Sequence, residues 1–117
     1  MNLARLEIEQ RGRALVVRVE GEVDLSNADE IRDDVSRAVP HDAAGVALDL
    51  TATTYLDSSG IRLLFDLAQR LHARRQQLVL VVTDQALVRR VILLTKLDDA
   101  VPLYAKLDDA LAALNGS

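Results

Sequence analysis

Short apolar runs alternate along this chain with longer segments in which apolar residues recur every three or four positions. Residues 45–50 and 77–82 are apolar and partly β-branched, which is typical of buried strands. Residues 58–74 carry apolar side chains at helical spacing between Ile61 and Leu71. Because helices alternate with apolar strands, the pattern predicts an α/β domain with a mostly parallel sheet.

The chain begins with a pattern of its own. Residues 3–10 and 14–20 alternate loosely between apolar and polar, and the Arg-Gly-Arg sequence at 11–13 is typical of a hairpin turn. We expect Gly21 to end the second strand. Since a hairpin pairs its strands antiparallel, the sheet is expected to be mixed. The apolar positions expected to share one face are Leu6, Ile8, Leu15, Val17 and Val19.

Capping residues and prolines predict where the elements begin and end. Ser26 occupies an N-cap position, with Asp29 three residues later in a capping-box position, and Pro40 ends that helix. A strand over 101–104 is expected at an edge of the sheet, since Pro102 has no N–H to donate to a neighbouring strand. About four helices are predicted, with starts near Ser26, Ser58, Gln85 and Lys106.

Composition predicts one domain over residues 1–117, ordered over about 3–114 and built on an aliphatic core. Half of the 117 residues are apolar, yet the aromatic residues are only two tyrosines and one phenylalanine. The formal charge of −4, with both signs interspersed, and the few aromatic residues argue against nucleic acid binding. The chain has no cysteine, so it can form neither a disulfide nor a thiolate metal site.

The sequence indicates neither a membrane span nor a targeting segment. No apolar run approaches the ~18 residues of a membrane-spanning helix. The first five residues, Met-Asn-Leu-Ala-Arg, lack the apolar stretch of a signal peptide. We therefore expect a cytoplasmic protein that has no membrane partner.

The residues most informative about function are Asp57-Ser58-Ser59-Gly60, which precede the apolar stripe of the helix at 58–74. They put two hydroxyl groups at a helix N-terminus, where free N–H groups and the helix dipole favour an anion, such as a phosphate carried by serine. One interpretation is a well-capped helix, with Asp57 or Ser58 as the N-cap. The other is a recognition site, because Gly60 is a poor helix former that lets another molecule approach the backbone closely.

Catalysis and metal binding are poorly supported. A hydrolase nucleophile at Ser58 would need a glycine two residues earlier, where this chain has Leu56. The histidines do not suit a base: His41 follows a helix-ending proline, and His72 lies about 20 Å further along the same helix. The paired aspartates lack companions at the spacing of metal ligands. We expect no enzymatic activity, no metal and no cofactor.

Five segments of the chain, taken in order, match the pattern of a known protein family. Gly-Glu-Val-Asp at 21–24 precedes the first expected helix, 46–50 is an apolar strand, and Tyr-Leu-Asp-Ser-Ser-Gly-Ile at 55–61 joins strand to helix. A second apolar strand follows at 78–82, and 88–97 matches a third helix and its end. In this combination the chain resembles STAS-domain proteins, in particular the stand-alone anti-sigma factor antagonists of bacteria. The resemblance covers nearly the whole chain and implies a single STAS-like domain.

The resemblance also implies a function and partners. In that family the unmodified protein binds an anti-sigma factor that is also a serine kinase, and so frees the sigma factor. The kinase phosphorylates the first serine after the aspartate, here Ser58, which ends binding; a metal-dependent serine/threonine phosphatase restores it. The expected partner-binding residues lie at the start of the helix at 58 and in the loop before the first helix: Asp24, Ser26, Asn27, Asp57, Ser58, Ser59, Gly60 and Arg62.

Two positions depart from the family pattern. Arg62 stands where many members carry a small residue, four residues after Ser58 on the same helical face, where it can pair with a phosphate or contact an acidic partner residue. The turn at 95–97, Thr-Lys-Leu, lacks the glycine common there, which predicts a local change at the helix end.

Other functions fit the same fold. STAS domains also serve as non-phosphorylated subunits of lipid-transport complexes and as scaffolds in stress-signalling assemblies. The helix start can instead be expected to bind a free anion or a nucleotide, as a small-molecule sensor does. Shifts in thermal stability with added nucleotides or phosphate would identify that alternative.

Overall fold

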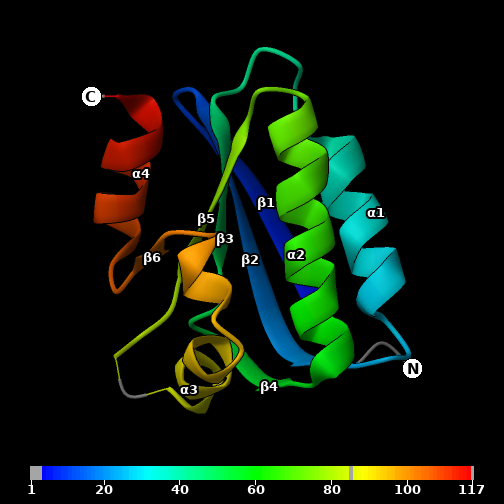
Figure 1. Ribbon diagram of the computed structural model, residues 1–117. Helices are drawn as coiled ribbons and strands as arrows, with labels where there is room; N and C mark the ends of the chain where they lie inside the picture. The colour runs from blue at the N-terminus through cyan, green and yellow to red at the C-terminus, as the bar shows by residue number, and fades with distance from the viewer. Residues whose placement is uncertain (1–3, 85, 117) are drawn as a thin grey trace.

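The sheet is assembled around its second strand. The computed structural model describes residues 4–84 and 86–116. Its strands are β1 (Ala4–Arg11), β2 (Ala14–Val23), β3 (Gly45–Asp49), β4 (Thr53–Leu56), β5 (Gln77–Val81) and β6 (Leu103–Tyr104). β2 pairs antiparallel with β1 and parallel with both β3 and β4. The path through the six-stranded sheet is β1-β2-β3-β5-β6, with β4 beside the end of β2 (Figure 1).

Helices cover both faces of this sheet. They are α1 (Ala28–Ala38), α2 (Ser58–Ala73), α3 (Leu87–Leu94) and α4 (Leu107–Asn115), with a short 3-10 helix at Leu97–Asp99. α1 and α2 lie side by side on one face, α4 lies on the other, and α3 lies near β4 (Figure 1). Within the part of the chain that the structure describes, no helix combines the length and the apolar character needed to cross a membrane.

The alternation of side chains along β2 divides the core into two parts. Leu15, Val17 and Val19 belong to the larger apolar cluster, which the sheet forms with α1, α2 and α3. Ala14 and Val16 point the other way and belong to the smaller cluster beneath α4. Both faces of the central strands are therefore buried, which confirms the predicted α/β class and the mixed sheet.

The predicted hairpin is confirmed, but one expectation about its strands is wrong. Ile8 pairs with Val17 and so lies on the expected face, although on the edge strand β1 it stays 47 % exposed. Gly21 does not end β2, because glycine tolerates the φ of 104° found there, and the pairing shifts between Gly21 and Glu22. The strand continues to Val23, pairing with β4, a strand that the sequence pattern did not predict.

The helix starts agree with prediction at two points and differ at a third. α2 begins at Ser58, and α4 begins directly after Lys106, as expected. α1 begins at Ala28 instead of Ser26, and the Ser26 hydroxyl does not cap it but donates a 2.6 Å hydrogen bond to Asp24. The start predicted near Gln85 falls outside the described residues; α3 is described from Leu87.

The last strand is shorter than predicted. β6 covers only Leu103–Tyr104, and it pairs with β5 alone. It therefore lies at the edge of the sheet, as the missing N–H of Pro102 predicted.

Lys96 ends α3 without the glycine that the family pattern has in this turn. Its backbone has φ 60° and ψ 25°, the left-handed conformation that glycine adopts most easily. The backbone N–H of Lys96 donates to the carbonyl of Leu93 at 3.2 Å, which closes the helix end. The turn therefore forms with a left-handed lysine in place of a glycine.

Replacing Lys96 with glycine is expected to raise the free energy of unfolding by up to about 1 kcal/mol, because a left-handed backbone costs an L-residue roughly 1–2 kcal/mol and glycine loses part of that gain as chain entropy. Arg90→Gly, inside α3, is the matched control and should lower stability by about 1 kcal/mol. Urea unfolding of both variants measures the two changes. A loss of stability in Lys96→Gly would contradict the role assigned to the turn.

Candidate functional site

Asp57 caps α2 and fixes where the helix starts. Its Oδ1 accepts hydrogen bonds from the backbone N–H groups of Ser59 and Gly60, at 2.8 and 3.1 Å. Its own backbone N–H donates to the carbonyl of Val23 at 3.3 Å, which joins the helix start to the end of β2. Of the two N-cap candidates, the structure selects Asp57, and Ser58 is the first residue of the helix.

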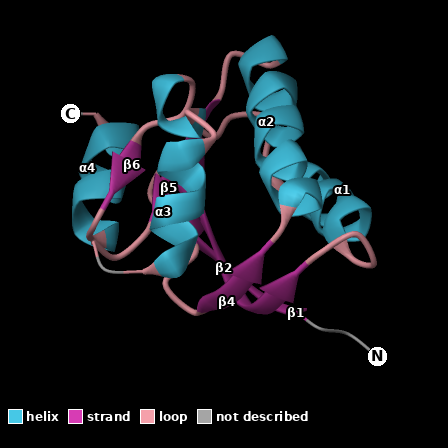
Figure 2. Cartoon of the chain, turned by 60° about the horizontal axis from the view of Figure 1, so that its bottom comes forward, coloured by secondary structure: helices cyan, strands magenta, loops and turns pink. Residues whose placement is uncertain are grey.

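Two segments distant in the sequence meet at this point. Val23 on β2 and Leu56 on β4 are paired neighbours in parallel strands. Asp24 and Asp57, the residues that follow them, therefore leave the sheet at the same edge. In this way the structure brings the loop before α1 next to the start of α2, as Figure 2 shows from the end of the sheet.

The loop before α1 is held by its own side chains. Asp24 Oδ1 accepts from both the N–H and the hydroxyl of Ser26, at 2.8 and 2.6 Å. Asn27 accepts from the N–H of Asp24 at 3.0 Å and donates to the carbonyl of Glu22 at 2.9 Å. Asn27 is only 5 % exposed. Asn27 therefore supports the loop from within, while Asp24 and Ser26 remain at the surface.

The two serines lie in different surroundings. Ser58 is exposed, and within residues 4–84 and 86–116 its hydroxyl forms no hydrogen bond. Ser59 is half-buried and lines a cleft of about 360 Å³ between α1 and α2, together with Leu25, Arg62 and Asp66. A macromolecule can therefore reach Ser58 directly, whereas Ser59 faces the groove between the helices.

Gly60 serves the packing of the helix, a role that the sequence analysis did not anticipate, and its expected contact with a partner stays a prediction. Gly60 is buried, and a Cβ added to it would overlap the side chain of Leu56 and lie 3.3 Å from Val23 Cγ1. Only glycine allows α2 to start this close to the ends of β2 and β4.

Exposed apolar side chains lie at the same end of the molecule as the serines, and sequence reasoning missed them (Figure 1). Leu25, in the loop before α1, is 82 % exposed, and Tyr55 on β4 is 49 % exposed. Leu87 and Leu94 on α3 are 73 % and 77 % exposed, and α3 packs against β4. Large apolar side chains exposed at one end of a domain are characteristic of interaction surfaces. A signal for Leu87 and Leu94 was available in the sequence, because both lie outside the buried helical stripe formed by Val88 and Ile92.

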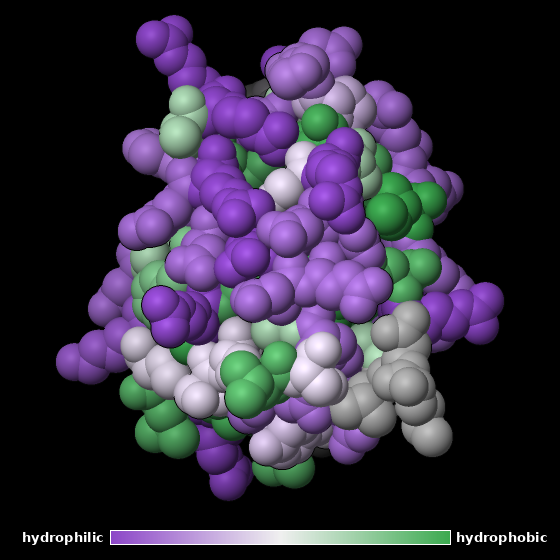
Figure 3. Space-filling model, turned by 90° about the vertical axis from the view of Figure 1, so that its right-hand side faces the viewer, coloured by the Kyte–Doolittle hydropathy of each residue, from purple (hydrophilic) through white to green (hydrophobic). Residues whose placement is uncertain are grey.

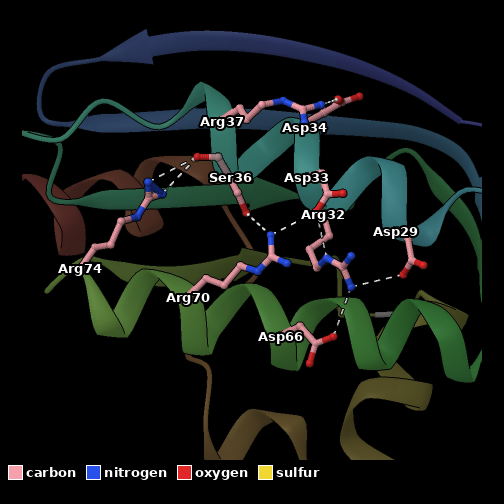
Figure 4. A network of polar contacts seen from close by, with 9 residues as sticks. All are labelled: Asp29, Arg32, Asp33, Asp34, Ser36, Arg37, Asp66, Arg70 and Arg74. Carbon is pink, nitrogen blue, oxygen red and sulfur yellow. Dashed lines mark hydrogen bonds and ion pairs between the residues drawn. The ribbon is translucent and has the colours of Figure 1, made fainter.

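Charged side chains join α1 to α2 along the side of the molecule (Figure 4). Arg32 on α1 pairs with Asp29 and Asp33 on its own helix, both at 3.2 Å, and with Asp66 on α2 at 3.5 Å. Arg70 on α2 pairs with Asp33 at 3.1 Å. The surface of this side of the molecule is accordingly mostly hydrophilic (Figure 3). The contacts fix the spacing of the two helices beside the cleft.

The network also shifts the titration of its members. The hydrogen bond from Arg32, followed by the one from Arg70, holds the pKa of Asp33 below its ordinary value. The hydrogen bond to Asp33 in turn raises the pKa of Arg32. Both groups are therefore held in their charged forms at neutral pH.

Comparison with known proteins identifies the family. The model of the STAS domain matches residues 5–110. The chain belongs to the STAS domain family. An anti-sigma factor antagonist from Mycobacterium paratuberculosis is 31 % identical, with a TM-score of 0.85 and coverage of 97 % of this chain and 95 % of that one.

More distant structures share the STAS fold. Unphosphorylated SpoIIAA, an anti-sigma factor antagonist, is 23 % identical with a TM-score of 0.78, and covers 97 % of this chain and 98 % of its own. Phosphorylated SpoIIAA from Bacillus is 21 % identical with a TM-score of 0.68, over 94 % of this chain and 99 % of that one. At these identities the likeness concerns the fold alone.

Replacing Gly60 with glutamine is expected to lower the free energy of unfolding of this STAS domain by about 1–3 kcal/mol, because the new side chain must displace Leu56. Ser58→Gln, two residues earlier on the exposed side of the same turn, should change stability by less than about 0.5 kcal/mol. Thermal unfolding of the two variants measures the difference. An unchanged melting temperature for Gly60→Gln would contradict the packing role of Gly60.

Replacing Asp33 with asparagine is expected to lower stability at neutral pH, because Arg32 and Arg70 lose a charged acceptor. The folded-state pKa of Asp33 lies below the unfolded one, so its contribution is full above about pH 4 and is lost as the pH falls through the folded-state value. The difference in free energy of unfolding between wild type and Asp33→Asn should therefore disappear when urea unfolding is repeated at decreasing pH, from about pH 7 to pH 2.5.

Asp34→Asn is the control for that experiment. Asp34 forms an ion pair at 2.7 Å with Arg37 of its own helix, and among the described residues it has no ion pair with α2. Asp34→Asn should lower the free energy of unfolding at neutral pH by less than Asp33→Asn does. Equal effects of the two substitutions, or a gap for Asp33→Asn that persists in acid, would show that the contacts between the helices contribute nothing measurable.

Proposed function

We propose that this STAS domain is an anti-sigma factor antagonist whose binding is switched off by phosphorylation of Ser58. The observation that carries the proposal is the exposed hydroxyl of Ser58, which forms no hydrogen bond within the described part of the chain, on a helix start held by the Asp57 cap. The anti-sigma factor antagonist that is 31 % identical over 97 % of this chain supports the role. The phosphorylated structure of SpoIIAA shows that a protein of this fold is modified by phosphate.

In the unmodified state the domain binds an anti-sigma factor that is also a serine kinase, and the sigma factor is released. The kinase transfers the γ-phosphoryl group of its ATP to Ser58. A bond forms between Ser58 Oγ and phosphorus, the bond from phosphorus to ADP breaks, and a base on the kinase takes the hydroxyl proton. A serine/threonine phosphatase reverses the change: water attacks phosphorus, inorganic phosphate leaves and the serine hydroxyl is restored.

Electrostatics explain how one phosphate ends binding. A phosphate on Ser58 adds a charge of about −1.5 to −2 at neutral pH, on a surface that already carries Asp24 and Asp57. One added charge about 6 Å from a partner carboxylate costs roughly 3 kcal/mol at an effective dielectric of about 20. That is roughly a hundredfold loss of affinity. The switch therefore requires no large conformational change in this domain.

The proposed contact surface combines residues expected from the sequence with residues found in the structure. Leu25, which lines the cleft with Ser59, and Tyr55, on the strand that leads into α2, supply exposed apolar area. Aromatic residues such as Tyr55 are enriched among the side chains that contribute most of the affinity at interfaces. The polar members are Asp24, Ser26, Asp57, Ser58, Ser59 and Arg62, and Gly60 and Asn27 support the surface from within.

Ser58, and not Ser59, is expected to receive the phosphate. In wild type and Ser59→Ala, intact mass after incubation with ATP and kinase-type anti-sigma factors of the same genome should rise by one phosphoryl group. Ser58→Ala should stay unmodified, bind persistently and unfold within about 0.5 kcal/mol of wild type, because Asp57 is the cap. Ser58→Asp should bind weakly, since it adds a charge.

Site-resolved mass spectrometry decides between the serines. Phosphate on Ser59 of the wild type, or full phosphorylation of Ser58→Ala, would overturn the assignment. A lipid-transport subunit, a scaffold or an anion sensor would leave Ser58 unmodified by every kinase tested and would bind no anti-sigma factor. The proposed role is binding in the cytoplasm, without catalysis by this chain and without a cofactor.

A further inference from the structure

Arg62 is placed to reach the first turn of α2. It lies four residues after Ser58, so the two side chains stand one turn apart on the same helical face. Side chains on a helix tilt toward its N-terminus, so an exposed residue covers the turn that precedes it. Arg62 is exposed and lines the cleft that also contains Ser59.

Arg62 also differs from the other arginines on this side of the molecule. Arg32 and Arg70 are engaged in the ion pairs between α1 and α2, and Arg74 donates to the carbonyl of Ser36 at 3.1 Å. Across residues 4–84 and 86–116, by contrast, Arg62 forms no ion pair and no hydrogen bond through its side chain. Its guanidinium group is therefore available to a new anion without breaking an existing contact.

We propose that Arg62 is the intramolecular counter-ion of a phosphate on Ser58. The inference rests on the proposed function, since that function supplies the phosphate. It adds that phosphorylation changes the surface in two ways: it introduces negative charge, and it draws the positive charge of Arg62 away from the partner.

The surroundings of the helix start explain why a counter-ion is needed. The N–H groups of Ser59 and Gly60 already donate to the Asp57 carboxylate. The backbone donors with which a helix N-terminus would bind an anion are therefore engaged. The acidic groups of this surface are Asp24 in the loop before α1 and, along the cleft that Arg62 lines, Asp29 on α1 and Asp66 on α2; Arg32 is shared among carboxylates. A dianion added here therefore meets net negative charge unless Arg62 turns toward it. A guanidinium group and a phosphate form a strong, charge-assisted pair.

The test uses the full chain with phosphoserine inserted at position 58 during translation, so that no kinase is needed. Phosphorus NMR then gives the second pKa of the phosphate. Because Arg62 favours the dianion, Arg62→Gln should raise this pKa by about 0.3 pH units, the size expected for an exposed pair one helical turn apart. About 1 M salt should abolish the difference.

Arg75→Gln is the matched control. It removes the same charge from an exposed residue just beyond the far end of α2, and it should leave the phosphate pKa unchanged. A second readout is the NMR signal of the Arg62 Nε–H, which should shift between the unmodified and phosphorylated chains while that of Arg75 does not. Circular dichroism verifies that each variant is folded.

Two outcomes would overturn the inference. One is a phosphate pKa that is equal in Arg62→Gln and in wild type; the other is an Arg62 signal unaffected by the phosphate. Neither outcome bears on whether a kinase modifies Ser58, because the phosphate is installed without one. Conversely, a chain that no anti-sigma factor phosphorylates can still show the pairing, so the two proposals fail separately.

Discussion

The site depends on the fact that one strand pairs with two parallel neighbours in succession. The first part of β2, as far as Arg18, pairs with β3, and its last part, from Gly21 to Val23, pairs with β4. If β2 ended at Gly21, it would not reach Leu56 of β4. The pairing of Val23 with Leu56 would be lost, and with it the hydrogen bond from Asp57 to Val23. The loop before α1 and the start of α2 form one surface because this pairing holds them together.

The rigidity of that surface comes from the helix behind it. Leu64, Leu67 and Leu71 of α2 are fully buried against the sheet, and burying a leucine contributes roughly 1.5–3 kcal/mol each. The ion pairs with α1 add little energy by comparison, because exposed pairs are weak. Their contribution is to set the spacing of two helices whose apolar packing alone is not directional. A helix start held in this way offers Ser58 to a partner in one fixed geometry.

Much of the fold could be predicted from local patterns, and particular residues show where prediction stopped. Helical spacing and the Asp-Ser-Ser-Gly element located the start of α2 at the correct residue. Strand β4 was missed because its four residues are half exposed and carry no clear alternation. Leu25 was missed because a leucine within a polar loop gives no sign of whether it is covered. The packing role of Gly60 was missed because it depends on Leu56 and Val23, whose side chains lie where a Cβ of residue 60 would be placed.

The sequence by itself determined the order of the helices and of every strand except β4, the edge position of the last strand and the presence of two hydroxyls at a helix start. These properties depend on residues within a few positions of one another, through periodicity, capping and proline chemistry. Only the tertiary structure decided that Asp57 is the cap, that Ser58 is exposed while Ser59 faces a cleft, and that Leu25 and Tyr55 are exposed. Pairing and burial join residues that lie tens of positions apart, and no local pattern records which partner the chain will find.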